Sequence, residues 1–215
     1  MHPTYDTLDD ALLALYPQIL AQGQVVEATR GRTRELIGVQ LEVARPRARL
    51  SRTETRGKPF SALGEFLWYM SRDNKLDFIT PYINRYQKES DDGLTVYGGY
   101  GPRLFRHRGQ DQIANVVARL KEKQGSRRAV VQLFDADDLA LRHKEIPCTT
   151  TLQFLIREGK LHLVAAMRSN DAVIGLPHDV FCFTMLQESI CSTPGVFGHT
   201  GASTDCPCSV ILMAS

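Results

Sequence analysis

Cys148 and Arg168 are two residues whose types and spacing could do chemistry together. Apolar residues alternate with others through residues 150–157 and again through 160–167, which predicts two β-strands. Between the strands lies Glu158-Gly159, a connection typical of a two-residue hairpin turn. The hairpin therefore brings the thiol and the guanidinium to the same end.

A turn centred between residues 158 and 159 predicts that Cys148 lies opposite Ser169. Arg168 then lies beside the thiol, and a nearby guanidinium stabilises a thiolate. The sequence thus indicates a nucleophilic cysteine at the open end of the hairpin.

A second candidate is Glu65, the only acid in the segment Phe60 to Met70, which is apolar almost all the way round a helix. A buried carboxylate costs free energy unless it is paired or protonated. Carboxyl groups with shifted pKa values are common in functional sites. Glu65 could equally pair with one of the many arginines and only hold structure.

Asp179 follows His178 just before an apolar run and falls where a helix N-cap belongs, which predicts a capping role. Arg127 and Arg128 precede a predicted strand at residues 129–134 and could be solvated or could clamp an anion. The positive charges of residues 45–58 favour a solvated surface, with phosphate or nucleic-acid binding as weaker alternatives.

The remaining periodicity predicts an N-terminal helix behind a capping box of Thr7 and Asp10, and a second helix around residues 113–120. From residue 189 onward the sequence loses all helical and strand period, which predicts an irregular tail through residue 215. Its Cys206-Pro207-Cys208 is too weak a pattern to predict a metal site.

Bulk composition indicates one globular domain: the 215 residues are 43% hydrophobic and 23% charged, with a net charge of +2. Nothing in these values points to nucleic acid. No apolar run is long enough for a membrane span, and the odd cysteine count favours free thiols, so we expect a cytoplasmic protein.

Several of these residues resemble the motifs of the thymidylate synthase superfamily, over roughly residues 25–188. The matching motifs are, in order, Arg30, Gly64-Glu65-Phe66-Leu67-Trp68, Tyr100-Gly101, Ser126-Arg127-Arg128, Pro147-Cys148, Arg168-Ser169, Asp171 and Gly175-Leu176-Pro177. The resemblance implies an α+β fold in which helices cover a mixed, twisted β-sheet, with a homodimer formed across the sheet. It covers a catalytic domain at residues 1–188 and leaves 189–215 unmatched, as in a truncation or shifted reading frame.

The resemblance also implies residue roles. Cys148 would add to C6 of a pyrimidine nucleotide, and Glu65 would manage protons through ordered water. The nucleotide would be held by Arg30, Arg168, Tyr100, Ser169, Asn170, Asp171 and Asp179, with Arg127 and Arg128 reaching across from a partner subunit. Methylenetetrahydrofolate would be the co-substrate, contacted by Lys58 and Asp171.

Two departures from thymidylate synthase indicate a different product. Asp179 stands where that enzyme has an Asn that reads uracil, and a carboxyl suits a 4-amino base. Residues 77–89 lack the Trp that lies near the transferred carbon in the methylating enzymes, so water could enter. These departures predict 5-hydroxymethylation of CMP or dCMP. The alternatives are methylation of dUMP, or an inactive nucleotide-binding homologue, which the unmatched tail favours.

Overall fold

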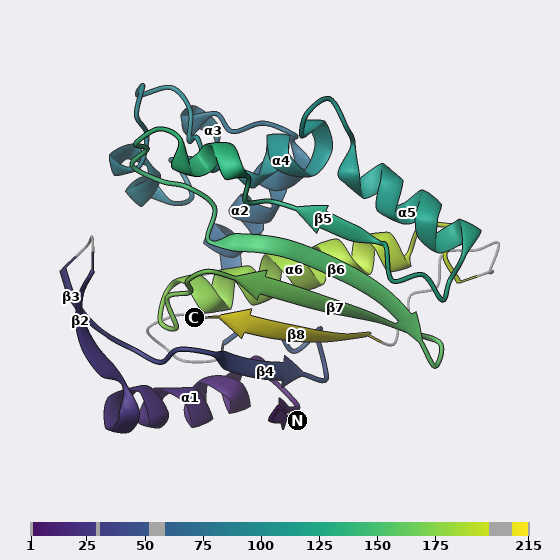
Figure 1. The fold of residues 1–215 in the computed structure, drawn as a ribbon, viewed down its shortest axis with the longest axis horizontal. Helices are drawn as coiled ribbons and strands as arrows, with labels where there is room; N and C mark the ends of the chain where they lie inside the picture. Colours follow the sequence, from purple (N-terminus) through teal and green to yellow (C-terminus); the bar gives the residue numbers. More distant parts are fainter. Residues whose placement is uncertain (1, 29–30, 52–58, 198–207, 215) are drawn as a thin grey trace.

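A mixed six-stranded sheet forms the centre of the molecule, in the order β1-β4-β8-β7-β6-β5 (Figure 1). The computed structural model describes residues 2–28, 31–51, 59–197 and 208–214. The strands of this sheet are β1 (Thr4–Tyr5), β4 (Val39–Val43), β5 (Val130–Gln132), β6 (Thr149–Arg157), β7 (Lys160–Met167) and β8 (Cys208–Ala214). A separate hairpin joins β2 (Gln24–Ala28) and β3 (Gly31–Glu35).

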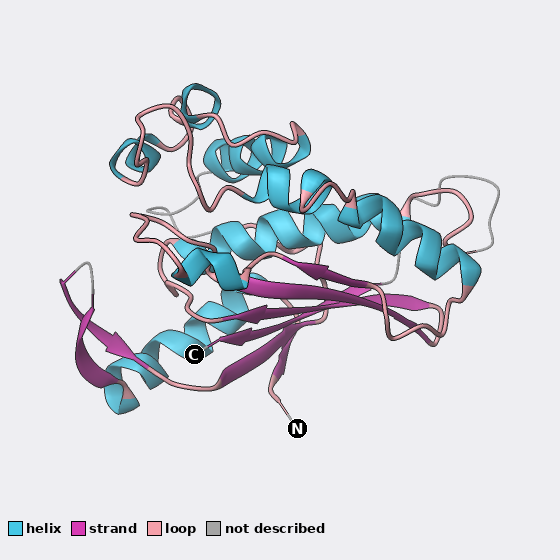
Figure 2. Ribbon diagram, turned by 45° about the horizontal axis from the view of Figure 1, so that its top comes forward, coloured by secondary structure: helices cyan, strands magenta, loops and turns pink. Residues whose placement is uncertain are grey.

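Helices lie over one face of this sheet (Figure 2). They are α1 (Leu8–Gln22), α2 (Pro59–Met70), α3 (Leu76–Ile79), α4 (Tyr100–Arg106), α5 (Gln112–Glu122) and α6 (Gly175–Cys191), with short 3-10 turns η1 (Asn84–Lys88) and η2 (Ala136–Leu139). α6 packs against β7 and β8, and α2 packs against α6. The expected α+β architecture of helices over a mixed sheet is confirmed.

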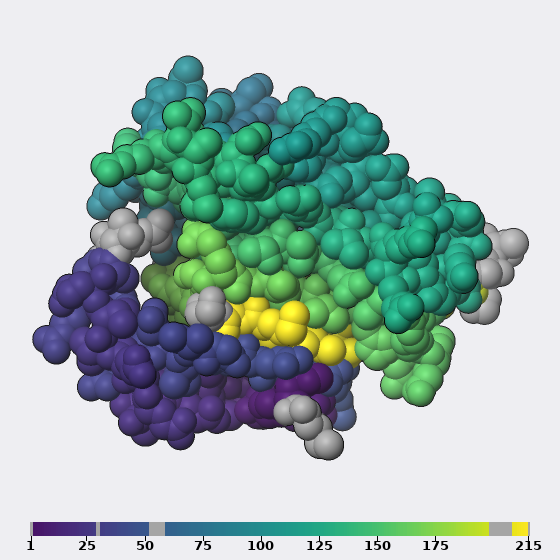
Figure 3. Space-filling model, viewed as in Figure 1, coloured from purple at the N-terminus to yellow at the C-terminus, as the bar shows by residue number. Residues whose placement is uncertain are grey.

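The strands alternate between buried and accessible side chains. On the helix-covered face, Leu152, Phe154, Leu163 and Leu212 are at most 2% exposed. Their neighbours on the other face are partly accessible, and Figure 3 shows β8 open on that face, between β7 and the N-terminal strands. The alternation arises because successive strand side chains point to opposite faces.

The predicted hairpin of β6 and β7 is confirmed. Arg157 pairs with Lys160, and Glu158 and Gly159 both have positive φ, as a tight primed turn requires. The register shifts between Thr149 and Thr151, so that Thr149 pairs with Met167. This irregularity makes the predicted opposition of Cys148 and Ser169 wrong.

Cys148 instead lies opposite Arg168, whose backbone N–H donates to the Cys148 carbonyl at 2.8 Å. A β-bulge opposes two residues to one and slips the register, and alternating apolar residues give no signal for it. The slip brings the arginine closer to the thiol than the sequence predicts.

Three further expectations can be judged from the structure. The capping box of Thr7 and Asp10 begins α1 as predicted. The expectation of an irregular tail is wrong for residues 208–214, because β8 pairs antiparallel with β4 and parallel with β7. The expectation of free thiols holds for Cys148, Cys182 and Cys208, whereas Cys191 is in a disulfide.

Gln187 fixes β8 to its neighbours. Its side chain is fully buried, and Nε2 donates to the carbonyls of Leu161 and Ser209 at 2.7 and 2.8 Å. Because these carbonyls belong to β7 and β8, one amide on α6 holds both strands.

Replacing Gln187 by Leu tests this connection. We expect the Gln187→Leu change to lower the free energy of unfolding by about 2–3 kcal/mol, because two buried carbonyls lose their donor. Urea denaturation measures it. Gln40→Leu, at an exposed glutamine whose side chain is bonded to His2 within the described part of the chain, should change stability by less than about 0.5 kcal/mol. Equal effects of the two changes would show that β8 is not held in this way.

Candidate active site

The thiol of Cys148 lies just before β6, half-buried and reduced. Arg168 Nη2 is 3.8 Å from Cys148 Sγ. The same guanidinium donates to the carbonyls of Pro147 and Ile146 at 2.9 and 3.0 Å. Arg168 therefore fixes the backbone that carries the thiol while placing positive charge beside it, which favours a thiolate.

Tyr100 links α4 to the start of β6. Its hydroxyl donates to Thr149 Oγ1 and accepts from the Thr149 backbone N–H, both at 3.0 Å. Burial raises the Tyr100 pKa well above its usual value, and the charges of Asp179 and Cys148 raise it further. Tyr100 therefore lies within electrostatic reach of both Asp179 and Cys148.

Glu65 is buried on α2 and accepts from three side chains. Tyr86 donates to Oε1 at 2.6 Å, Tyr69 donates to the same oxygen at 3.2 Å, and His178 Nδ1 lies 2.8 Å from Oε2. The alternative that Glu65 pairs with an arginine is not found among the described residues. Its partners come from α2, η1 and α6.

His178 continues this network to Ser61, whose Oγ lies 3.1 Å from Nε2. With Glu65 ionised, Nδ1 carries the proton and Nε2 accepts from the Ser61 hydroxyl. Burial, followed by the charge of Glu65, raises the pKa values of Tyr69 and Tyr86 well above the usual range. Both phenols therefore stay protonated and keep donating to the carboxylate.

Asp179 lies in the second turn of α6, which begins at Gly175, so the predicted N-cap role is wrong. The helix starts earlier because the Asp171 carboxylate accepts from the N–H groups of Val173 and Ile174 and organises the turn before it. Burial raises the pKa of Asp179 well above its usual range, Glu65 raises it further, and a hydrogen bond from Asn170 opposes the shift.

The predicted site residues fall into three groups. Cys148, Arg168, Ser169, Asn170, Asp171, Tyr100, Glu65 and Asp179 come from the open end of the β6–β7 hairpin and from α2, α4 and α6 around it. Arg127 and Arg128 are exposed near the other end of β6, about 20 Å along the strand from Cys148. Arg30 and Lys58 lie outside the described residues.

Sequence reasoning missed Tyr69, Tyr86 and His178. Tyr69 could have been found, because it stands four residues after Glu65 on one helix face. Tyr86 and His178 contact Glu65 only through tertiary packing, so no local sequence pattern predicts these contacts. Among the described residues, no group of three His, Cys, Asp or Glu side chains could hold a metal ion, and no helix is both long and apolar enough to cross a membrane.

Comparison with known proteins identifies the family. The family model described as thymidylate synthase matches residues 10–203, so the chain belongs to the thymidylate synthase family. A protein of Pseudomonas phage M6 named deoxyuridylate hydroxymethyltransferase is 35% identical over 146 residues, covering 66% of this chain and 42% of the relative.

Two other relatives give a similar picture. A protein of Delftia phage PhiW-14 with the same name is 28% identical, covering 80% of this chain and 52% of the relative. A thymidylate synthase of Bacillus subtilis subsp. natto is 32% identical, covering 63% and 51%. The chain thus spans about half the length of the curated relatives it matches.

The raised pKa of Asp179 can be tested by measuring how the stability of the protein depends on pH. A buried acid with a raised pKa in the folded state destabilises the folded protein increasingly as pH rises above the pKa of the same acid in the unfolded chain, here 3.8. The free energy of unfolding stops falling once the pH passes the pKa of the folded state. We expect Asp179→Asn, which removes this penalty, to gain stability relative to the unchanged protein as pH rises from about 4.

Urea denaturation of both proteins between pH 4 and pH 8 measures the difference. Asp137→Asn, at an exposed acid, is the matched control and should show no such trend. A stability difference for Asp179→Asn that is constant or shrinks with pH would contradict the raised pKa.

Proposed function

We propose that the protein transfers a one-carbon unit to C5 of a pyrimidine nucleoside monophosphate, and that the product is hydroxymethylated. The proposal rests on three features of the candidate site. The Cys148 thiol lies beside Arg168, the buried Glu65 accepts hydrogen bonds from three donors, and Asp179 lies on α6 with a pKa raised by burial. Family membership supports this class of reaction.

The proposed mechanism begins with attack of the Cys148 thiolate on C6, which makes C5 nucleophilic. Methylenetetrahydrofolate, when bound, supplies the one-carbon unit. Glu65, held by Tyr69, Tyr86 and His178, is fixed where it can relay protons to and from the ring. The Asp171 carboxylate is exposed, and it could accept hydrogen bonds from the N–H groups of a pterin ring. Arg168 would bind phosphate, joined by Arg30 and, for the folate, Lys58.

Asp179 is the residue that reads the base in this proposal. A protonated carboxyl both donates and accepts, so it can donate to cytosine N3 while accepting from the 4-amino group. The same carboxyl can donate to uracil O4 while accepting from N3–H. Cytosine N3 is the more basic atom, and accepting the proton there would make C6 more electrophilic. Asp179 therefore favours a cytidylate, CMP or dCMP.

Deoxyuridylate is the second candidate substrate. It is favoured by the names of the phage relatives, which are called deoxyuridylate hydroxymethyltransferases. Methylation of deoxyuridylate is the third possibility, in keeping with the thymidylate synthase relative. The cytoplasmic location, and the expectation that the protein does not bind nucleic acid, stay predictions.

Product analysis distinguishes these candidates. The protein is incubated with methylenetetrahydrofolate and CMP, dCMP or dUMP, and the product is weighed by mass spectrometry. We expect hydroxymethyl cytidylate, abolished by Cys148→Ser and retained by Cys208→Ser, a change at a second half-buried free thiol. A methyl product from dUMP alone would contradict the proposal. Nucleotide binding without product would support an inactive homologue.

We also propose a homodimer across the open face of the sheet. That face carries the partly accessible apolar residues Leu155, Val164, Ala166, Ile211 and Met213. Arg127 and Arg128 are too far from Cys148 of their own chain to touch the same nucleotide. Two-fold pairing of the sheets would give each site the arginines of the other subunit.

Mixing two inactive variants tests this arrangement. Cys148→Ser lacks the nucleophile, and Arg127→Ala combined with Arg128→Ala lacks the partner's phosphate contacts. After the two are unfolded and refolded together, we expect activity to return, because each mixed dimer has one site with both components. Each variant refolded alone is the control, and the absence of any recovery in a mixture shown to be dimeric would overturn the proposal.

A further inference from the structure

Glu145 is an acidic residue three positions before Cys148 that the mechanism above does not use. It lies in the segment whose next two carbonyls, those of Ile146 and Pro147, are held by Arg168. The guanidinium that approaches the thiol therefore also fixes the backbone next to Glu145.

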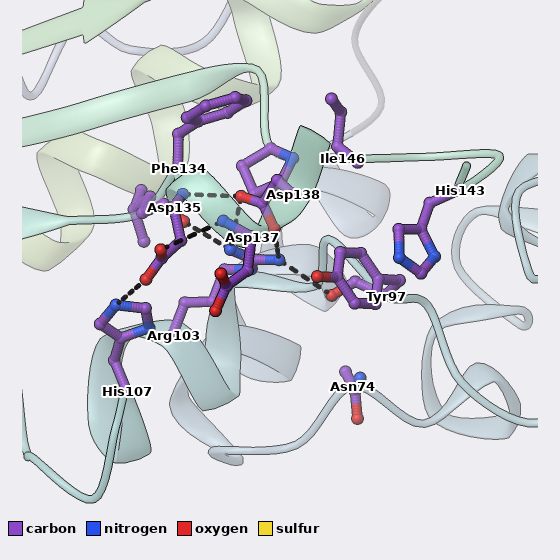
Figure 4. Close-up of polar contacts among 12 residues, drawn as sticks. Asn74, Tyr97, Arg103, His107, Phe134, Asp135, Asp137, Asp138, His143 and Ile146 are labelled. Carbon is purple, nitrogen blue, oxygen red and sulfur yellow. Dashed lines mark hydrogen bonds and ion pairs between the residues drawn. The ribbon is translucent and has the colours of Figure 1, made fainter. Parts of the chain in front are cut away.

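The other side of this segment is anchored by Asp91 and Tyr97. His143 Nδ1 lies 3.0 Å from the Asp91 carboxylate, and the Lys144 backbone N–H donates to the same carboxylate at 3.1 Å. The His143 ring stacks on Tyr97 with centroids 3.5 Å apart, and Figure 4 shows the two rings side by side with Ile146 farther along the segment. The hydrogen bond from His143 lowers the Asp91 pKa, which keeps this anchor ionised.

Tyr97 is in turn part of a rigid base. Its carbonyl accepts from Arg103, which forms a buried ion pair with Asp138 at 2.7 Å (Figure 4). The segment from His143 to Cys148 is thus fixed at both ends, and the direction of the Glu145 side chain is set by its neighbours.

That direction is inward. Glu145 Oε2 is buried, and it lies so close to Gly98 that a Cβ at position 98 would clash with it. The glycine leaves room for the carboxylate against the backbone. A solvated surface glutamate would need no such space.

The carboxylate also lies near the Glu65 network. Burial and Glu65 raise the Tyr86 pKa most, and the charge of Glu145 raises it further. Tyr86 donates to Glu65 at 2.6 Å. Glu145 and Glu65 therefore both act on the Tyr86 phenol, and Glu65 already accepts from three side chains.

We propose that Glu145 takes the proton from the water that attacks the exocyclic methylene of the nucleotide, a role that rests on the function proposed above. The water oxygen bonds to the methylene carbon and its proton passes to the Glu145 carboxylate. The methylene double bond moves to C5–C6, and the Cys148 thiolate leaves C6. The product is the hydroxymethyl nucleotide, so Glu145 sets the choice of hydroxymethyl over methyl.

The reverse of this step can be measured without folate. The protein is incubated with 5-hydroxymethyl-dCMP, 5-hydroxymethyl-CMP or 5-hydroxymethyl-dUMP in ¹⁸O-labelled water, and mass spectrometry follows ¹⁸O entering the hydroxymethyl group. In parallel, exchange of the C5 hydrogen of the unmodified nucleotides is followed in deuterated water. The second reaction needs Cys148 but no attack by water on a methylene.

We expect Glu145→Gln and Glu145→Ala to slow ¹⁸O exchange about a hundredfold and to leave C5 hydrogen exchange within about twofold. Cys148→Ser should abolish both. Glu89→Gln is the matched control, since Glu89 is a buried acid that also acts on Tyr86 but pairs with Arg85 at 3.3 Å, and it should leave ¹⁸O exchange unchanged.

The outcomes separate the two proposals. Unchanged ¹⁸O exchange in both Glu145 variants, parallel loss of both exchanges in both variants, or no ¹⁸O exchange in the unchanged protein despite C5 hydrogen exchange, would overturn the role of Glu145 alone. No C5 hydrogen exchange with any of the nucleotides would overturn the proposed function itself.

Discussion

The candidate site is arranged around one buried carboxylate, which needs hydrogen-bond donors on all sides. Glu65 lies on the buried face of α2, and an unpaired charge there would be prohibitively costly. Its three donors come from three elements, and Trp68 packs its ring 5.2 Å from that of Tyr86. Satisfying the carboxylate therefore fixes α2, η1 and α6 relative to one another. The same contacts fix the first turns of α6, which carry Asp179 directly after His178.

Local patterns in the sequence predicted the elements that depend on local interactions. The β6–β7 hairpin, the capped α1 and the apolar α2 all follow from periodicity and turn chemistry over a few residues. The bulge at Thr149 could not be predicted, because either register leaves the apolar residues on the covered face. The prediction of Asp179 as a cap was wrong because the Asp171 carboxylate already accepts from the backbone N–H groups just before α6. The sequence has two acids near the same helix end, and it does not show which of them lies at the start of the helix.

Features that need distant parts of the chain were the least predictable. The apolar run Val210 to Ala214 is typical of a buried strand, but its position between β4 and β7 is defined only once both neighbours exist. The network of Glu65 is similar, because Tyr86 and His178 are 21 and 113 residues away. The family resemblance identified most of the candidate residues, whereas the physical role of His178 emerged only from the assembled site.

The central position of β8 has a consequence for how the chain folds. β1 and β4 join the rest of the main sheet through β8, so β4 and β7 each lack one of their two neighbouring strands until residues 208–214 arrive. Contacts of such long sequence separation form slowly, because loop-closure entropy is lost before any pairing is gained. Until then, β4 and β7 each present an unpaired edge that other chains could bind. Sheet completion is therefore the step at which folding and aggregation compete.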